Sequence, residues 1–226
     1  MMKTINYKIM FIIILVGMTI SHAEQKSLRE IFDQIIYKDE PYASSELIEK
    51  GMPKDFYSAK KAFDGKVETA WVEGVEGDGI GEYIYLNLHF VSLPMYDDFK
   101  DNKKKIEVEI TIVNGVAKNK QIWEMNNRIK RAELEIYEAP VVVRQIEPCI
   151  ISKQEPVINS KYILNFKDDM KPQKFLIKFL PKQRYEKNLT NSFLCIGKLI
   201  IKEVYPGTKY KDTGISEINA RRIDED

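Results

Sequence analysis

Apolar and polar residues alternate along several stretches of the chain, with the period of two that is typical of a strand with one buried face. The clearest stretches are residues 83–90, 106–112 and 132–137. Four further runs, residues 141–143, 162–166, 175–180 and 196–204, are rich in β-branched and aromatic residues. Prolines 140, 156, 172, 181 and 206 punctuate the runs. Many short strands with little helix predict an all-β protein, an antiparallel sandwich or barrel.

One stretch near the start has the spacing of a helix instead. Within residues 24–38, apolar side chains recur at three- and four-residue intervals: Leu28, Ile31, Phe32, Ile35 and Ile36. Pro41 follows, and proline ends a helix. We therefore predict a short amphipathic lead-in helix within residues 24–41, followed by one sandwich domain over residues 42–226.

The first 23 residues have the pattern of a cleaved signal peptide. Lys3 and Lys8 precede an uncharged run over residues 9–20, which closes on Ser21-His22-Ala23. The apolar run is about 12 residues, shorter than the roughly 20 that span a bilayer. We expect cleavage after Ala23, no membrane span in the mature form, and a protein that is periplasmic, surface-associated or secreted.

Composition narrows the class of partner and the number of domains. With 226 residues and 44% hydrophobic content, the chain can bury the core of one domain. Loss of Lys3 and Lys8 on cleavage changes the formal charge from +1 to −1. A near-neutral protein gives no electrostatic reason to expect nucleic acid as a partner.

Cysteine and histidine are scarce, which limits metal and nucleophile chemistry. Cys149 and Cys195 are the two cysteines. In an oxidising compartment they form either one disulfide, which would stabilise by about 4 kcal/mol, or two buried thiols. His89 is the one histidine after the predicted cleavage site, and its place in the alternating run favours a surface position on a strand. A single histidine excludes multi-histidine metal sites, and two cysteines cannot build a structural zinc site without help from carboxylates.

Residues 57–82 contain an unusual density of glycine. Five glycines fall within seventeen residues: Gly65, Gly74, Gly77, Gly79 and Gly81. A phosphate-binding loop would be followed by a helix, whereas a predicted strand follows here. We interpret the glycines as a structural corner, with Phe63 and Trp71 as core anchors on either side of Asp64-Gly65. Trp71→Ala is then expected to unfold the domain.

A second interruption of the strand pattern, residues 117–131, carries candidate ligand-binding residues. Trp123, Asn126, Asn127 and Arg128 suit a sugar, because an aromatic face stacks on a pyranose while amides and a guanidinium bond its hydroxyls. The alternative is that Trp123 plugs the end of the sandwich and Arg128 pairs with a nearby carboxylate. On the first interpretation Trp123→Ala leaves folding nearly intact.

Three ordered segments resemble a known family. They are AFDGKVETAWVEGVEGDGIGE at residues 62–82, IVNGVAKNKQIWEMNNRIKRAELEI at 112–136 and EVYPGTKYKDTGISEI at 203–218. Together they resemble the discoidin or galactose-binding-like jelly rolls, and within them the NADase-type glycan-binding, or NAD glycohydrolase translocation, domain. The resemblance implies a jelly-roll β-sandwich that is a non-catalytic binding module for glycan or another cell-surface ligand, without NADase activity.

The same resemblance implies a structural calcium ion. Many galactose-binding-like domains hold calcium at a D-G-x-x-x-T-x-W turn, and Asp64, Thr69 and Glu217 stand at the matching positions. Calcium prefers six to eight oxygen ligands, which a turn supplies as carboxylates and carbonyls. Lys66 departs from this pattern by placing a cation near the ion. The alternative is that Asp64 caps its own turn and Glu217 is a surface charge.

Two other classes of function remain open from the sequence. One is a structural or adhesive envelope protein that binds another protein. The other is a hydrolase that uses Asp78, Glu82 or Glu124 as paired carboxylates. Acidic residues number 34 in this chain, so two of them in loops carry little weight.

Overall fold

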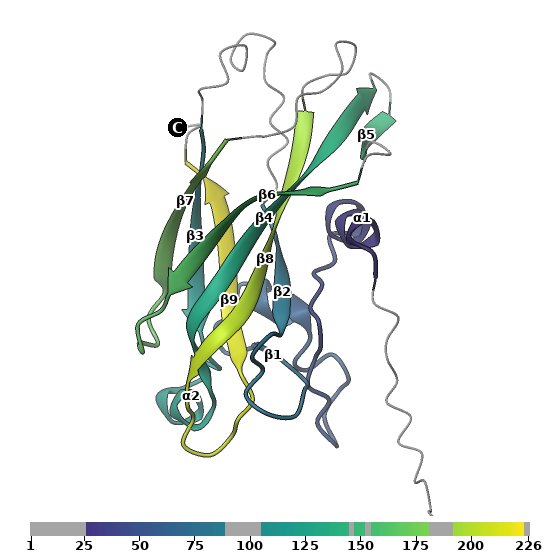
Figure 1. The fold of residues 1–226 in the computed structure, drawn as a ribbon. Helices are drawn as coiled ribbons and strands as arrows, with labels where there is room; N and C mark the ends of the chain where they lie inside the picture. Colours follow the sequence, from purple (N-terminus) through teal and green to yellow (C-terminus); the bar gives the residue numbers. More distant parts are fainter. Residues whose placement is uncertain (1–25, 89–104, 145–146, 152–154, 181–191, 224–226) are drawn as a thin grey trace, which may run out of the picture.

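The computed structural model describes residues 26–88, 105–144, 147–151, 155–180 and 192–223, and in them the chain forms a sandwich of two antiparallel sheets (Figure 1). One sheet has the order β1-β9-β3-β7, and the other has β2-β8-β4-β5 with β6 also paired to β4. The first sheet comprises β1 (Trp71–Val72), β9 (Gly214–Arg222), β3 (Ile106–Asn114) and β7 (Gln173–Phe179). The second comprises β2 (Tyr83–Asn87), β8 (Ser192–Tyr205), β4 (Arg128–Arg144), β5 (Glu147–Ile151) and β6 (Val157–Asn165). The predicted antiparallel sandwich is confirmed.

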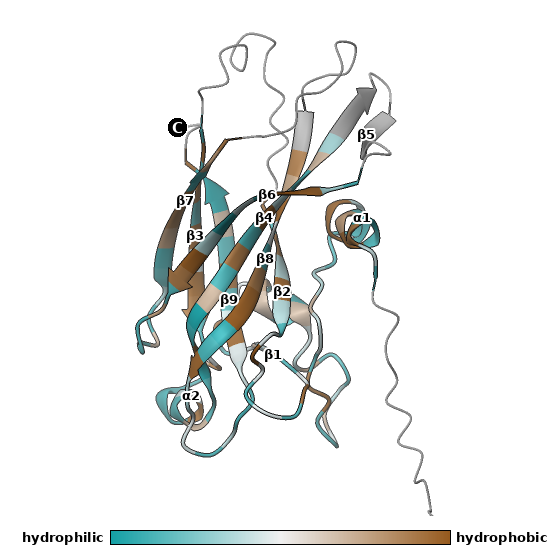
Figure 2. Cartoon of the chain, in the orientation of Figure 1, coloured by the Kyte–Doolittle hydropathy of each residue, from teal (hydrophilic) through white to brown (hydrophobic). Residues whose placement is uncertain are grey.

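Alternating side chains of the two sheets form the core between them. Along β3 every second residue from Ile106 to Ile112 is fully buried, while Glu107 and Glu109 between them are half-exposed. The alternation is visible as brown and teal bands along the strands in Figure 2. Inward-facing side chains of β4 meet those of β3 from the other sheet. The period of two in the sequence therefore records one buried face for each sheet.

Helix α1 (Leu28–Lys38) packs on the outer face of the five-stranded sheet. Ser27 begins it with a capping box, because its hydroxyl accepts the N–H of Glu30 while the Glu30 carboxylate accepts the N–H of Ser27. Its buried side chains contact Tyr85 and Tyr137 of the sheet. The predicted lead-in helix is confirmed, with its start at Leu28. None of the helices in the described ranges has the length and hydrophobicity that a membrane crossing requires.

Two of the predicted boundaries are wrong. Pro140 does not separate two strands: it lies within β4, between the segment that pairs with β6 up to Glu138 and the segment that pairs with β5 from Val141. A residue without an N–H fits this gap in the pairing. Residues 117–131 are not one loop, because they contain helix α2 (Lys120–Met125) and the start of β4.

Helix α2 and strands β1, β5 and β9 could not be predicted from the alternation of apolar and polar residues. The Asn119 side chain caps α2 by accepting the N–H of Ile122 at 2.9 Å. Strands β1, β5 and β9 were not predicted; β1 has two residues and β5 has five, too few to give a clear period. Short elements of this kind depend on partners elsewhere in the chain.

The two cysteines lie in different strands of the five-stranded sheet. Cys195 is a fully buried free thiol in β8, and burial raises its pKa. Cys149 belongs to β5, and its side chain lies outside the described part of the chain. His89 and the predicted signal peptide, residues 1–23, also lie outside the described residues.

The glycine-rich stretch forms a corner around a buried carboxylate. The Glu73 side chain is fully buried, accepts the N–H groups of Thr213 at 3.1 Å and Val75 at 2.9 Å, and has a pKa raised by burial. Gly79 has a positive φ of 68°, and a Cβ there would lie 2.6 Å from Cγ of Glu73. Only glycine fits this position. The corner connects β1 to β2 along the chain, and the hydrogen bond from Thr213 to Glu73 attaches it to the segment just before β9.

Trp71 anchors this corner in the core, as predicted. Its side chain is fully buried, and its indole Nε1 donates a hydrogen bond of 2.9 Å to the carbonyl of Ser45. Phe63, the other predicted anchor, is half-buried and packs against the same core cluster.

Trp71→Ala is expected to lower the free energy of unfolding by about 3–5 kcal/mol, because it leaves a large cavity and a carbonyl without its donor. Urea denaturation of the full chain measures this. Ile48→Ala is the control, since Ile48 is 72% exposed and its truncation should change stability by less than about 0.5 kcal/mol. Equal stability of the two variants would contradict the role given to Trp71.

Candidate functional site

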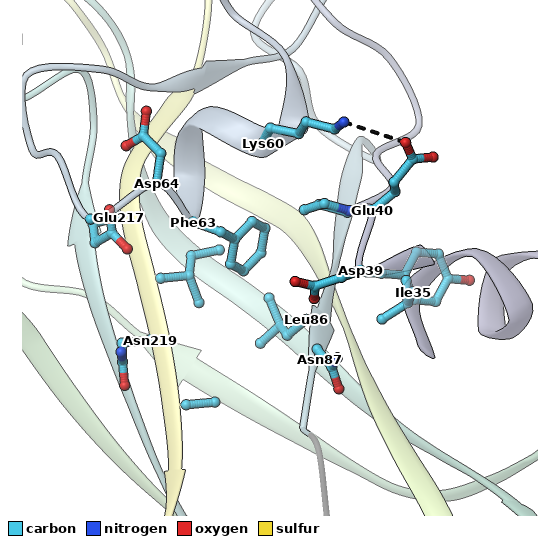
Figure 3. A pocket seen from close by; sticks show the side chains of 15 residues that line it. Ile35, Asp39, Glu40, Lys60, Phe63, Asp64, Leu86, Asn87, Glu217 and Asn219 are labelled. Carbon is cyan, nitrogen blue, oxygen red and sulfur yellow. Dashed lines mark hydrogen bonds and ion pairs between the residues drawn. The ribbon is translucent and has the colours of Figure 1, made fainter. Parts of the chain in front are cut away.

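A pocket of about 480 Å³ opens at the side of the sandwich, between the C-terminal end of α1 and strands β2 and β9 (Figure 3). Short helix η1 (Ala59–Ala62) and the turn after it close a third side. Aromatic and amide groups line the pocket: Phe63, Tyr85, Asn87 and Asn219. Carboxylates and one lysine complete the polar lining: Asp39, Glu40, Asp64, Glu217 and Lys60.

The pocket exists because β1 is short. β1 pairs with β9 at Gly214 and Ile215 only. The following part of β9, residues 217–220, lines the pocket instead of pairing with a longer β1. The far side of β9 is occupied, because it pairs with β3 along its length. The site therefore lies at a gap between the edges of the two sheets.

Asp39 has an unusual backbone at the rim of the pocket. It is the C-cap of α1, its N–H bonds the carbonyl of Gln34, and its φ is 52°. Among the described residues it is the one non-glycine residue with a positive φ. Aspartate tolerates this conformation better than most residues, but it remains uncommon.

Asp64 and Thr69 form a cluster of oxygen atoms beside the pocket. The Thr69 hydroxyl lies 2.8 Å and 3.0 Å from the two carboxylate oxygens of Asp64, 2.9 Å from the carbonyl of Lys66 and 3.5 Å from the carbonyl of Lys61. One hydroxyl has one proton to donate among these four acceptors. Oxygens in such excess over donors suit a hard cation.

Glu217 approaches the same turn from β9. Its carboxylate accepts backbone N–H groups of Gly65 and Lys66, while its Oε2 atom is buried without a hydrogen-bond partner. Burial raises the pKa of the Glu217 carboxyl above its ordinary value; the two N–H groups oppose this, and the charge of Asp64 adds to it.

The structure therefore brings together the three residues predicted for calcium. They come from the turn after η1 and from β9, which are far apart in sequence. No set of three or more His, Cys, Asp or Glu side chains converges as metal ligands in the described ranges, so backbone carbonyls would have to contribute. The side chain of Lys66 is exposed. Asp64 also caps its own turn, by accepting the N–H of Lys66 at 3.0 Å, as the alternative interpretation expected.

The four residues predicted to bind a sugar also lie together, but they face inward. Trp123 is 7% exposed and its Nε1 donates to the carbonyl of Asn114 at 2.8 Å. The Arg128 guanidinium stacks on the Trp123 ring at 4.6 Å and bonds both carboxylate oxygens of Asp168, at 3.0 and 2.9 Å. It also donates to the carbonyl of Pro206 at 3.0 Å. These contacts match the alternative interpretation, a plug at the end of the sandwich with a paired arginine.

The two asparagines of this group are bound within the protein as well. The Asn127 side chain donates to the carbonyl of Lys211 at 2.6 Å and accepts the N–H of Gly207 at 2.7 Å. The Asn126 amide donates to the carbonyl of Ile122 at 2.9 Å. Asn127 thus holds the loop before β9, and Asn126 bonds the helix that it follows, so these groups are already engaged within the protein. Burial of the indole instead predicts that Trp123→Ala destabilises the fold, against the expectation that folding stays intact.

The three carboxylates considered for a hydrolase do not form a pair at a cleft. Glu82 accepts the hydroxyls of Ser44, at 2.6 Å, and of Ser45. Glu124 pairs with Lys120 on α2, and Asp78 is exposed in the glycine-rich corner. None of them lines the pocket.

Asp39 and Glu73 are two of the polar residues that the sequence did not single out; the pocket residues Glu40, Lys60, Asn87 and Asn219 are others. Asp39 precedes Pro41 at the end of a predicted helix, which marks a C-cap but not a pocket. Glu73 lies within the glycine-rich stretch, where its burial depends on the distant Thr213. Neither the position of Asp39 at a pocket nor the burial of Glu73 can be predicted from the residues next to them in the sequence.

The comparison with family models decides the family. Residues 34–221 match the NAD glycohydrolase translocation F5/8 type C domain. The chain belongs to this family. It is a family of binding and translocation domains of the F5/8 type C kind, and the match covers all described strands up to Arg221. No curated protein matched the chain.

Solved structures of low identity accompany the family match. The F5/8 type C domain of a Bacteroides fragilis protein is 16% identical, with a TM-score of 0.41, over 81% of this chain and 91% of that one. CpGH89CBM32-5 from Clostridium perfringens, in complex with GalNAc-β-1,3-galactose, is 20% identical, with a TM-score of 0.41, over 80% and 93%. Arabinofuranosyltransferase AftD from Mycobacteria is 13% identical, with a TM-score of 0.42, and the match spans 83% of this chain but 10% of that enzyme.

Trp123→Ala is expected to lower the free energy of unfolding by about 3 kcal/mol or more, because packing is lost and the carbonyl of Asn114 loses its donor. Trp123→Phe should fall between wild type and alanine, since it restores packing but not the donor. Tyr210→Ala is the control, because Tyr210 is 40% exposed. Thermal and urea unfolding of the three variants would contradict the buried role if Trp123→Ala behaved like the control.

Proposed function

We propose that this F5/8 type C domain is an exported, non-catalytic module that binds glycan in the pocket of Figure 3. Membership of a binding-domain family supports a binding role. The observation that carries the proposal is the pocket itself, which is concave, preformed and lined by apolar, aromatic and polar side chains. The signal-peptide pattern of residues 1–23 supports export.

The lining has the chemistry that a sugar requires. Half-buried Phe63 provides aromatic surface for the apolar face of a pyranose, and the buried Tyr85 ring lies behind the lining. Asn87 and Asn219 provide amides, and the carboxylates provide acceptors for hydroxyl groups. Trp123 and Arg128 support the loop end of the sandwich and are not part of this site.

Filling the pocket is expected to weaken glycan binding at least tenfold. Asn219 is exposed on β9 at the pocket, so Asn219→Trp places an indole there with little strain on the core. Leu176→Trp is the matched control, because Leu176 is 53% exposed on β7 of the same sheet and lies outside the pocket lining. A glycan array that includes GalNAc-β-1,3-galactose should show binding by wild type and the control and at least tenfold weaker binding by Asn219→Trp.

Equal binding by all three proteins would exclude the pocket. Binding by none, together with capture of a specific protein from envelope extracts, would favour the protein-binding alternative. The array therefore tests the location of the binding site and the glycan-binding function separately.

A structural calcium ion at Asp64, Thr69 and Glu217 is also part of the proposal. The excess of oxygen acceptors around the Thr69 hydroxyl and the unpartnered Oε2 atom of Glu217 support it. Asp64 and Glu217 would supply charge, while the Thr69 hydroxyl and the carbonyls of Lys61 and Lys66 would supply neutral ligands. The ion would join the turn after η1 to β9 and so hold one wall of the pocket.

Calcium is expected to raise the melting temperature of the EDTA-treated protein. Mass action gives about 2.7 kcal/mol at a concentration of 100 times Kd, which is several degrees for a domain of this size. Asp64→Asn should remove the shift, whereas Asp55→Asn, at an exposed residue outside the oxygen cluster, should retain it. Calorimetric titration without heat, together with an unchanged melting temperature, would contradict the site.

The pH dependence of that shift follows from Glu217. Because the folded pKa of Glu217 is raised, the protonated folded form is favoured at low pH and this contribution to stability is lost as pH rises through the folded pKa. Calcium competes with the same proton. Its stabilising effect should therefore grow as pH rises, and should be lost on acidification at a higher pH than an ordinary glutamate would give.

A further inference from the structure

We propose that an extended peptide adds to the free edge of β9 and places two of its side chains in the pocket of Figure 3. Such a ligand belongs to a different class from a glycan, because the backbone of β9 and an apolar wall would recognise it. The hydrogen-bond pattern of β9 and the lining of the pocket support this site.

The pairing of β9 with β3 shows which backbone groups point toward the pocket. Ile223 directly follows β9, and its N–H bonds the carbonyl of Glu107, the residue opposite it in the register, at 3.0 Å. In an antiparallel pair, hydrogen-bonded and non-hydrogen-bonded positions alternate. Counting back from Ile223, the odd-numbered residues of 217–221 therefore direct their N–H and C=O groups to β3. Ile218 and Ala220 direct theirs away from β3.

The pairing of β9 with β1 gives the same orientation. The carbonyl of Thr213 accepts the N–H of the residue that follows β1, so Ile215, two positions later, also faces β1. The bulge at residue 216 then shifts the alternation by one. Ile218 and Ala220 therefore continue the side of β9 that Ile215 begins. Because β1 has already ended there, no strand of the described chain pairs with these two residues on that side.

The same two residues contribute to an apolar wall of the pocket. The side chain of Ile218 belongs to the main core cluster, and Ala220 packs against that cluster. Phe63 and Leu86 line the pocket from the turn after η1 and from β2, and Figure 3 shows both beside β9. Opposite residues of an antiparallel pair point to the same face of a sheet. Peptide residues opposite Ile218 and Ala220 would therefore place their side chains in the pocket, whose volume is about 480 Å³.

An extended peptide is the ligand that suits this edge. Two N–H donors and two C=O acceptors alternate along it, and another strand matches their spacing. The added strand would continue the ladder that β1 forms with β9. Its two residues that face the pocket would be apolar, and the residue between them would face away from the pocket. A glycan in the same pocket would exclude the peptide.

The edge of β7, on the other side of the same sheet, is less suitable. The hydroxyl of Tyr162 already donates to the carbonyl of Lys178 in β7 at 2.7 Å. Lysine side chains at positions 174 and 178 are exposed there, and lysine on an edge strand discourages pairing. No residue of β7 lines the pocket. We therefore place the peptide at β9.

Amide hydrogen exchange of the full chain, followed by NMR without any ligand, tests the free edge. The N–H groups of Asn219 and Arg221 point to β3 and should be protected. Those of Ile218 and Ala220 should exchange at least about tenfold faster, because water reaches them in the pocket. Equal protection of all four, or the reverse order, would contradict the free edge.

A library of neutral heptapeptides, acetylated and amidated at their ends, tests the ligand. The third and fifth positions vary, while threonine and glutamine fill the others so that charge plays no part. Fluorescence polarisation should select apolar residues at both varied positions. N-methylation at the third or fifth residue removes an N–H that faces β9 and should weaken binding about tenfold, the size of one hydrogen bond. N-methylation at the fourth residue, whose N–H faces away from β9, should weaken it less.

Ala220→Pro tests the protein side of the pairing. Proline has no N–H, and position 220 does not use its N–H in the ladder with β3, so the strand should tolerate the change. Peptide binding should fall about tenfold, with the melting temperature nearly unchanged. Leu176→Pro is the matched control, since by the same alternation its N–H points away from β3 at the edge of β7. It should bind the peptides like wild type.

The N-methylated peptides test the pairing even if Ala220→Pro does not fold. No binding by any library member would overturn the proposal, as would equal effects of N-methylation at the third, fourth and fifth residues. Unchanged binding by folded Ala220→Pro would overturn it too. None of these assays contains a glycan, so each of these results leaves the proposed glycan-binding function standing. A glycan array without signal would in turn leave the peptide site standing.

Discussion

A single buried amide fixes the separation of the two sheets at one end of the sandwich. Asn114 ends β3 at a bulge, and its fully buried side chain donates to the carbonyl of Ile129 at 2.7 Å and accepts the N–H of Ile129 at 2.9 Å. Ile129 belongs to β4 of the other sheet, so one side chain takes the place of a backbone pair between sheets. The carbonyl of Asn114 then receives the Trp123 indole. Trp123 and Arg128 are structural because they complete this closure.

The side of the sandwich differs from this closed end, because it holds a pocket. Strand β1 covers two residues of β9, and within the described part of the chain no longer strand pairs with the residues of β9 that follow. The end of α1 and the turn after η1 border that gap without filling it (Figure 3). The end of the sandwich is closely packed because the side chains of Asn114 and Trp123 bond to backbone groups there. The side is open because β1 is short and polar side chains line the edge of β9. The second arrangement leaves room for a ligand.

The sequence predicted what depends on local pattern. Alternation identified β2 and β3, helical spacing identified α1, and the flanking strand identified Trp71 as a core anchor. The candidate site was harder, because composition cannot show which way a side chain points. Trp123 beside amides has the same appearance in a sequence whether it stacks on a sugar or closes a core. The pocket joins four segments far apart in the chain, so no window of sequence contains it.

The oxygen cluster and the pocket are linked through shared charge. Asp64 and Glu217 belong to both, and the raised pKa of Glu217 reflects burial and the neighbouring Asp64. A cation in the cluster would bind these carboxylates and remove negative charge from one wall of the pocket. A proton on Glu217 competes with that cation, so the charge on this wall of the pocket depends both on occupancy of the cluster and on pH.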